Sequence, residues 1–190
     1  MEELIDVLNE DGTKTGKVVT RKEVHEKGLL HRIVVIAIVD KEGHILMQQR
    51  AQNRETNPGK WDVSAAGHVS SGQTSVQAAI REVEKEVGIH LEEKELEYIF
   101  TYKKESKVKE HFISNHIFDF YIVKRNKIDL DQVKMQESEV EQVKLCDKKD
   151  VEEMLYKNIT VERKPVYEEL IKYLKWFKME EIWLKFYLYA

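Results

Sequence analysis

A predicted amphipathic helix in the middle of the chain constrains the fold more than any other feature of the sequence. Thr74 or Ser75 can cap this helix, which continues to Val87 and is ended by Gly88. Aliphatic residues recur along it at the spacing that places them on one side of a helix, so this side is expected to dock on a β-sheet. The members of this apolar stripe are Val76, Ile80, Val83 and Val87.

A group of charged residues occupies a second side of the same helix. Glu82, Lys85 and Glu86 lie three or four positions apart, so a rotation of about 100° per residue brings them together. Two carboxylates separated by one turn can hold a hard divalent cation through oxygen, which is the ligand atom that Mg²⁺ prefers. The alternative for such a helix taken alone is a solvated charged face with an ion pair between Glu82 and Lys85.

The rest of the chain alternates strand patterns with helical patterns, which predicts an α/β protein with a mixed sheet sandwiched between helices (α/β/α). The small residues Ala65-Ala66-Gly67 are typical of a turn. Helices are expected at 21–27, from a capping Asp147 to about Lys157, and from about Pro165. Strands are expected at 4–8, 17–20, 33–39, 44–50, 61–64, 96–103, 113–123 and 140–145.

A length of 190 residues suits one domain, 1–190, with a full hydrophobic core. Its last helix, at about 165–188, carries aromatic residues at helical spacing, and such a stripe usually packs on its own domain. Because the tail 182–190 is apolar, the second interpretation is that it contacts a partner subunit in a homodimer.

Composition and charge exclude several classes of partner. A net charge of -4 gives no broad basic face, which argues against a nucleic-acid partner but not against a small phosphorylated ligand, because a bound metal supplies positive charge locally. No apolar run approaches the roughly 20 residues that cross a bilayer, so no membrane partner is expected. The acidic start Met1–Val7 lacks the pattern of a secretory signal, and the single cysteine, Cys146, favours a reducing, cytoplasmic location.

The region from Gly67 to Ile89 resembles the Nudix box. It reads Gly67, five residues, Gln73, seven residues, and then Arg81-Glu82-Val83-x-Lys85-Glu86-x-Gly88-Ile89, so that seven of the nine specified positions match. The resemblance extends from about Leu4 to Leu155, and Gln48-Gln49-Arg50 and Pro58-Gly59-Lys60-Trp61-Asp62 also look like this family. The chain is most similar to the branch near isopentenyl-diphosphate isomerase, which includes many hydrolases.

This resemblance implies a fold, a cofactor and a set of roles. It implies a Nudix fold and the hydrolysis of a diphosphate linkage in a small molecule, such as a nucleoside diphosphate linked to another group. Glu82 and Glu86 would be the catalytic residues and would bind Mg²⁺ or Mn²⁺ together with the carbonyl of Gly67. Arg81 would pair with Gln73 and brace the loop against the helix.

Two positions depart from the box. Gln73 replaces a glutamate, so its bond to Arg81 would be a neutral-acceptor hydrogen bond. Lys85 replaces a glutamate that usually helps to bind metal, which removes an anionic ligand and adds a cation near the metal position. We therefore expect weaker metal binding, or a direct contact between Lys85 and a substrate phosphate.

Several residues outside the helix are candidates for substrate or metal contacts. Arg50 and Arg54 flank a polar loop and could hold a phosphate; exposed loop arginines are the alternative interpretation. His31 and His68 match the two places at which isomerases of this branch bind metal with histidine, and His116 is a further candidate. Hydrogen-bonded structural histidines are the alternative for each. Glu137 and Glu139 precede a strand, where Nudix enzymes often place an extra carboxylate; simple surface charge is the alternative interpretation.

Two other functions remain as alternatives. Isopentenyl-diphosphate isomerases carry a cysteine immediately before the box glycine, and Ala66 stands at that place here, so isomerase activity is not expected. A non-catalytic ligand-binding module is the other alternative, because Gln73 and Lys85 depart from the catalytic pattern.

Overall fold

The computed structural model describes residues 2–175. Contacts between residues divide the chain into two compact units. The first unit consists of Met1–Ile36, Ala65–Lys85 and His90–Ile122, and the second of Ala37–Ser64, Glu86–Ile89 and Val123–Ala190. The boundary between the units runs through the third strand, the box helix and the eighth strand, so each of these elements contributes to both.

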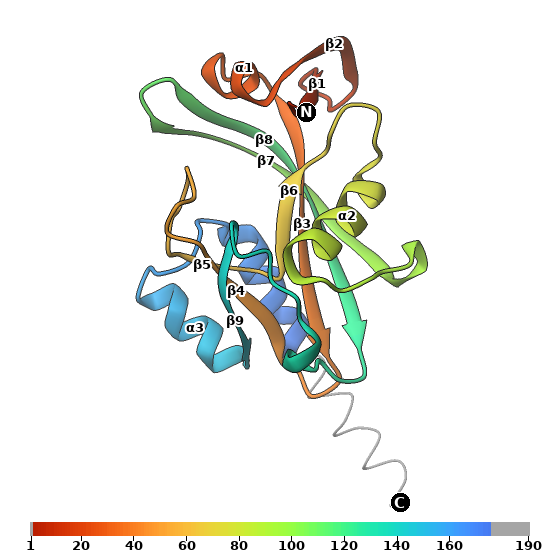
Figure 1. Cartoon of the computed structure of the whole chain (residues 1–190), viewed down its shortest axis with the longest axis vertical. Helices are drawn as coiled ribbons and strands as arrows, with labels where there is room; N and C mark the ends of the chain where they lie inside the picture. Colours follow the sequence, from red (N-terminus) through yellow and green to blue (C-terminus); the bar gives the residue numbers. More distant parts are fainter. Residues whose placement is uncertain (1, 176–190) are drawn as a thin grey trace, which may run out of the picture. The chain divides into compact units, whose positions relative to one another are not determined.

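The first unit begins with β1 (Leu4–Leu8) and β2 (Lys14–Thr20), an antiparallel pair followed by α1 (Arg21–Glu26) (Figure 1). The hydroxyl of Thr20 caps α1 by accepting from the backbone N–H of Glu23 at 3.1 Å. Buried aliphatic side chains from these three elements pack on one another, which holds α1 on the hairpin. They are Ile5, Val7, Val19 and Val24.

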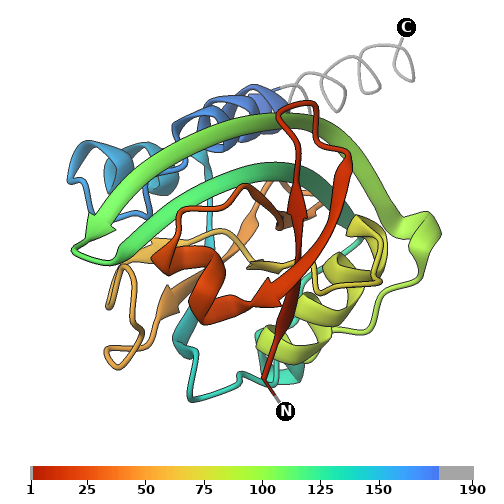
Figure 2. The ribbon, with the colours of Figure 1, turned by 90° about the horizontal axis from the view of Figure 1, so that it is seen from above.

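The main sheet of the first unit is built on the first half of β3 (His31–Asp40), where Val34, Val35 and Ile36 are fully buried. β6 (Ala65–His68) pairs with β3 in antiparallel register, with Val34 opposite Gly67. β8 (Phe112–Arg125) and β7 (Leu96–Lys109) follow β3 in the strand order β3-β8-β7. Figure 2 shows β7 and β8 as two long, curved strands side by side. A 3₁₀ turn, η1 (Glu93–Glu95), precedes β7.

The box helix, α2 (Ser75–Val87), runs over the length that the sequence predicts. Val83 and Val87 are fully buried, as expected for its apolar stripe, whereas Val76 and Ile80 are only partly buried. Ala78 and Ala79 are buried in their place, because small side chains let a helix approach its neighbours closely. Gly88 follows the helix with a φ of 69°, the left-handed conformation that glycine adopts without strain at a helix end.

The second unit is centred on β4 (Ile45–Arg50), which forms antiparallel pairs with the end of β3, with β5 (Trp61–Asp62) and with β9 (Val140–Cys146). α3 (Lys148–Tyr156) is capped by Asp147, as predicted, in a capping box with Asp150. A 3₁₀ turn, η2 (Leu130–Gln132), lies between β8 and β9. No helix in the described part of the chain is long and apolar enough to span a bilayer.

The last described helix covers residues 164–175, so its start agrees with the prediction from Pro165. Tyr167, Leu170 and Leu174 are almost completely buried, so this part of the predicted aromatic and aliphatic stripe does pack on the protein. Arg163 lies just before this helix and forms a buried ion pair, in which its Nε donates to the carboxylate of Asp62 at 3.0 Å. The predicted partner contact of the tail 182–190 lies outside the described residues.

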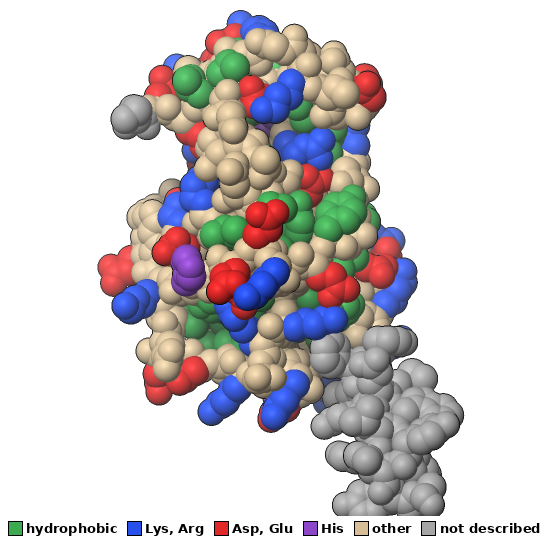
Figure 3. All heavy atoms as spheres, turned by 90° about the vertical axis from the view of Figure 1, so that its right-hand side faces the viewer, with side chains coloured by type: hydrophobic (Ala, Val, Ile, Leu, Met, Phe, Trp, Pro, Cys, Tyr) green, Lys and Arg blue, Asp and Glu red, His purple; other side chains and the backbone are tan. Residues whose placement is uncertain are grey.

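The α/β class with a mixed sheet and helices is confirmed. The prediction of a turn at Ala65-Ala66-Gly67 is wrong, because these residues belong to β6 and pair with β3. Small residues suit a turn, but they also suit a strand that lies close beneath a helix. On the face drawn in Figure 3, acidic and basic side chains are mixed, so neither positive nor negative charge forms a continuous patch there.

Candidate active site

The close approach of Glu82 to the backbone of β6 explains why the box begins with a glycine. The side chain of Glu82 is 2% exposed and lies against Gly67. A methyl group added to Gly67 would overlap the carboxylate carbon of Glu82. Gly67 has no positive φ, so the requirement is for space and not for an unusual backbone conformation. The first unit therefore presents a buried carboxylate directly beside the backbone of the box glycine.

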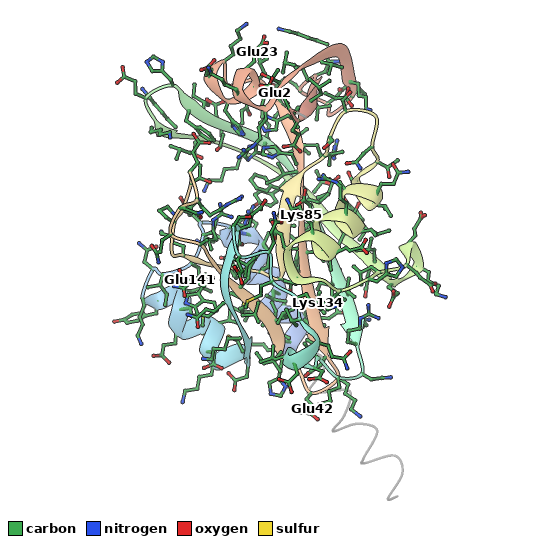
Figure 4. All side chains as sticks on the ribbon, in the orientation of Figure 1. Glu2, Glu23, Glu42, Lys85, Lys134 and Glu141 are labelled. Carbon is green, nitrogen blue, oxygen red and sulfur yellow. The ribbon has the colours of Figure 1, made fainter. Side chains whose placement is uncertain are left out.

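Two basic side chains from α2 compensate the charge of Glu82. The guanidinium of Arg81 lies 2.8 Å from Oε1, and the ammonium of Lys85 lies 2.6 Å from Oε2. Lys85 approaches from the surface, since its side chain is 35% exposed (Figure 4 labels it on α2). The ion pair between Glu82 and Lys85 that the helical spacing indicates is therefore present, but its acidic partner is buried and not solvated.

Arg81 braces the loop before the helix through the backbone. Its Nη2 donates to the carbonyl of His68 at 2.7 Å. Gln73, the predicted partner, does not take part, because its buried Oε1 has no hydrogen-bond partner. The predicted bond between Arg81 and Gln73 is therefore absent from the structure. The backbone carbonyl of His68, the residue after Gly67, is the acceptor instead.

Glu86 belongs to the second unit, where it is also buried. The amide of Gln48 on β4 donates to its Oε2 at 2.7 Å, and only 2% of Glu86 is exposed. Backbone N–H groups of Lys134 and Gln136 donate to the carbonyls of Val87 and Glu86, which closes the end of α2. Gln48 is not among the predicted site residues. A glutamine inside a strand of buried aliphatic residues was the signal that could have identified it.

Arg50 and Arg54 both make contacts within the second unit. Arg50 donates through Nε and Nη2 to the carbonyl of Thr56, at 3.1 Å and 2.9 Å. Burial lowers the pKa of the Arg50 guanidinium from its usual range. Arg54 pairs with Glu139 at 2.9 Å, so one of the two loop carboxylates named from the sequence has a basic partner. Glu137 is exposed.

Four histidines of the first unit converge on one point. His25 comes from α1, His31 from β3, His68 from β6 and His116 from β8. One ring nitrogen of each lies within 4.8 Å of those of the others. His31, His68 and His116 were candidates from the sequence, but His25 was not, because nothing in a short surface-like helix indicates that its histidine turns inward.

Two imidazoles of this four-histidine cluster make hydrogen bonds of the kind that metal-ligating histidines make. Nδ1 of His25 lies 3.1 Å from the carbonyl of Ile113, and Nδ1 of His31 lies 2.8 Å from the carbonyl of Leu29. Such carbonyl contacts fix the tautomer and leave Nε2 with its lone pair. Nε2 of His31 is buried and has no hydrogen-bond partner. The ring nitrogens of His25 and His68 approach to 3.1 Å.

The imidazoles of His31 and His68 are held in the neutral form that binds metal. Burial, followed by charge repulsion from His25 and Arg21, lowers the pKa of His31 to about 4. Burial also lowers the pKa of His68 well below its ordinary value. Neutral imidazole suits Zn²⁺, Cu²⁺, Fe²⁺ and Ni²⁺, whereas Mg²⁺ prefers oxygen. The cluster therefore fits a transition metal, and the carboxylates of α2 offer the oxygen ligands of a harder ion.

A second group with ligand-type side chains, Asp40, Glu42 and His44, has a simpler explanation. Asp40 accepts from the backbone N–H groups of Glu42 and His44, both at 2.9 Å, and its other oxygen lies 3.1 Å from Nδ1 of His44. These are the contacts of an Asx-type turn between β3 and β4.

Acid should destabilise the metal-free protein through His31. Its pKa is about 4 in the folded protein and near 6.5 in the unfolded chain, so the unfolded chain takes up the proton first as the pH falls. Stability is therefore full above pH 6.5 and is lost between 6.5 and 4, with His31 contributing about 3 kcal/mol of the loss. Urea unfolding at pH 7 and 4.5 in the presence of EDTA measures this change.

The control for this pH experiment is His90, whose side chain is 76% exposed. His31→Gln should reduce the pH dependence of the free energy of unfolding, and His90→Gln should leave it unchanged. The same pH dependence in both variants would show that burial of His31 does not govern acid stability.

The fold and the buried carboxylates of α2 define a Nudix-domain protein. The family model described as NUDIX domain matches residues 29–170, and the chain belongs to this family. Its α/β fold with a mixed sheet and helices is the Nudix fold.

Curated relatives come from plants and bacteria. The chain is 37% identical over 169 residues to Nudix hydrolase 3 of Arabidopsis thaliana, a match that covers 87% of the chain but only 21% of that longer protein. It is 34% identical over 147 residues to the uncharacterised Nudix hydrolase lmo0368 of Listeria monocytogenes, covering 77% of the chain and 81% of that protein. An isopentenyl-diphosphate Delta-isomerase of Serratia proteamaculans is 34% identical over 103 residues, covering 54% of the chain and 56% of that protein.

Among solved structures, DR0079 from Deinococcus radiodurans superposes with a TM-score of 0.65 at 15% sequence identity. The superposition covers 90% of the chain and 99% of that protein. At this identity the likeness shows the fold alone.

Proposed function

We propose that the chain hydrolyses a diphosphate linkage in a small molecule, of the type in which a nucleoside diphosphate is joined to another group, with the help of Mg²⁺ or Mn²⁺. The observation that carries this proposal is the buried carboxylate of Glu82 beside the backbone of Gly67, within a box that matches at seven of nine positions. Relatives named as Nudix hydrolases support the same reaction class.

In this proposal Glu82, Glu86 and the carbonyl of Gly67 hold the divalent ion. When bound, such an ion neutralises diphosphate oxygens and lowers the pKa of a bound water. The carboxylate of Glu82, or one outside the box, accepts a proton from the attacking water. Arg81 keeps Glu82 oriented through its contact at 2.8 Å and ties the helix to the carbonyl of His68.

Basic and imidazole side chains are assigned to the substrate. Lys85 lies on α2 with a side chain that is 35% exposed, and Arg50, whose guanidinium also donates to the carbonyl of Thr56, is the proposed phosphate contact in the second unit. His31 and His68 act through the four-histidine cluster, which we assign to a bound transition metal. A metal held by neutral imidazoles keeps its full positive charge and attracts an anionic substrate.

Cleavage of the diphosphate linkage in a panel of nucleotide sugars, dinucleotides and prenyl diphosphates, followed as formation of the monophosphate products, tests this function. We expect hydrolysis of one class of substrate, with turnover that requires Mg²⁺ or Mn²⁺ and stops with EDTA. The panel should be run with protein loaded with Zn²⁺ and with protein free of it, because the four-histidine cluster and α2 favour different ions. Absence of cleavage of every substrate under all of these conditions would contradict the proposal.

Two other activities are outcomes of the same panel. Isomerisation of isopentenyl diphosphate is not expected, because Ala66 at the position of the isomerase cysteine has no proton to give. Cys146 does not replace it, because it lies on a different strand, β9, far from Ala66 in the sequence, and burial raises the pKa of its thiol to about 11. Binding of a nucleotide without any turnover would instead support a ligand-binding module.

A further inference from the structure

We propose that Lys85 is a tethered competitor for the metal ion at Glu82: its ammonium occupies a cation position on the carboxylate, and a divalent ion binds Glu82 only by displacing it. This inference rests on the proposed role of Glu82 as a metal ligand and adds a control of that site by the chain itself. It accounts for a lysine at a position where the Nudix box has a glutamate.

Both oxygens of Glu82 already face a cation. Arg81 lies 2.8 Å from Oε1 and Lys85 lies 2.6 Å from Oε2, while the carboxylate itself is 2% exposed. A buried carboxylate in this state has its charge compensated without any metal. Arg81 is also bound to the carbonyl of His68, which anchors it. The side chains of Arg81 and Lys85 are about equally exposed, at 34% and 35%, but the ammonium of Lys85 stands at the end of a flexible aliphatic stem, so a metal ion can displace it toward solvent.

Burial distinguishes this ion pair from the other lysine pairs of the first unit. Lys94 and Glu92 also approach to 2.6 Å, but their side chains are 78% and 60% exposed. Water screens such a surface pair, so it contributes little. The ammonium of Lys85 instead contacts the buried carboxylate of Glu82. At the same distance of 2.6 Å, two opposite charges attract each other more strongly there than at the exposed surface.

The tether makes Lys85 an effective competitor. Lys85 lies three residues from Glu82 on the same helix, so its contact with the carboxylate is intramolecular and a free divalent ion must compete with it at all times. Removal of the ammonium leaves a buried carboxylate with less positive charge around it, which favours uptake of another cation. Because a charge-assisted contact of this kind is lost, we expect Mg²⁺ to bind roughly 10- to 100-fold more tightly when Lys85 is made neutral.

Mg²⁺ binding to the metal-free protein, measured by calorimetry and by thermal unfolding, tests this inference. Mg²⁺ is the probe because imidazoles bind it poorly, so the four-histidine cluster does not contribute. Lys85→Gln should unfold at a lower temperature than the wild-type protein without Mg²⁺ and should recover stability when Mg²⁺ is added. Its Kd for Mg²⁺ should be at least about ten times lower than that of the wild-type protein.

Three further variants make the result specific. Lys94→Gln removes a lysine paired at the same distance on an exposed glutamate, and it should bind Mg²⁺ as the wild-type protein does. Lys85→Arg keeps the charge and should retain weak binding. In the double variant that combines Lys85→Gln with Glu82→Gln, the gain in Mg²⁺ affinity should disappear. If Lys85→Gln proves too unstable to study, Lys85→Met keeps the aliphatic stem and removes the charge.

Equal Mg²⁺ affinity in the wild-type protein and in the neutral Lys85 variants would overturn the inference. A gain in Mg²⁺ affinity that persists in the variant that also carries Glu82→Gln would overturn it too. No substrate is used in these measurements. A protein that hydrolyses nothing in the substrate panel can therefore still show competition at Glu82, and an active hydrolase can fail to show it.

Discussion

Glu86→Gln is expected to reduce hydrolysis by roughly 100-fold or more while leaving the protein folded, because it removes the charge of a proposed metal ligand without changing the shape of the side chain. Glu86 is 2% exposed and accepts from the amide of Gln48 at 2.7 Å. A glutamine can turn its carbonyl oxygen toward Gln48 and keep this bond. The loss should therefore appear as a lower kcat and a higher Mg²⁺ requirement, measured in steady-state assays across Mg²⁺ concentrations.

Glu84→Gln is the matched control for this prediction. Glu84 lies on the same helix, two residues before Glu86, but it is exposed and pairs only loosely with His90, at 3.7 Å. It should retain the activity of the wild-type protein. If Glu86→Gln keeps most of the activity, or if both variants lose it equally, Glu86 is not a metal ligand for the reaction.

His31→Ala is expected to weaken Zn²⁺ binding by roughly 100-fold or more, because it reduces the four-histidine cluster to three ligands. His31 is fully buried, its Nδ1 is held by the carbonyl of Leu29 at 2.8 Å, and its Nε2 has no hydrogen-bond partner. These contacts place an unused lone pair at the centre of the cluster. Competition with a chromophoric chelator measures the affinity, and the absorption spectrum of bound Co²⁺ reports the number of nitrogen ligands.

His90→Ala provides the comparison, since its side chain is exposed and lies outside the cluster. It should bind Zn²⁺ as the wild-type protein does. Wild-type protein that does not bind Zn²⁺ at micromolar concentrations would contradict the assignment of a metal to the cluster. Unchanged affinity in His31→Ala would show that the metal binds elsewhere.

Periodicity and spacing predicted the α/β class and the bounds of the box helix, because these depend on contacts between near neighbours. The helix ends at Val87 as expected, since Gly88 is free to adopt a positive φ. The helix from Asp147 and the hairpin of β3 and β4 were predicted for the same reason. The strand β6 was missed, because its small residues carry no strand pattern and only the pairing with β3 makes it one.

The sequence by itself also determined which side chains of the helix share a face, since the geometry of a helix is the same wherever it forms. It therefore predicted that Glu82 and Lys85 would be close. Only the tertiary structure decided that Glu82 is buried against Gly67, which turns a surface ion pair into a compensated internal charge. The structure also replaced the predicted acceptor Gln73 by the carbonyl of His68.

The four-histidine cluster shows the same limit most clearly. The sequence identified three of its members one at a time, each with a structural role as the alternative. It contained no sign that His25 joins them, because the four residues come from α1, β3, β6 and β8 and span about half of the chain. Chemical type is encoded locally, but the convergence of side chains that lie far apart in sequence depends on strand pairing and packing, and only the folded chain brings the four ring nitrogens together.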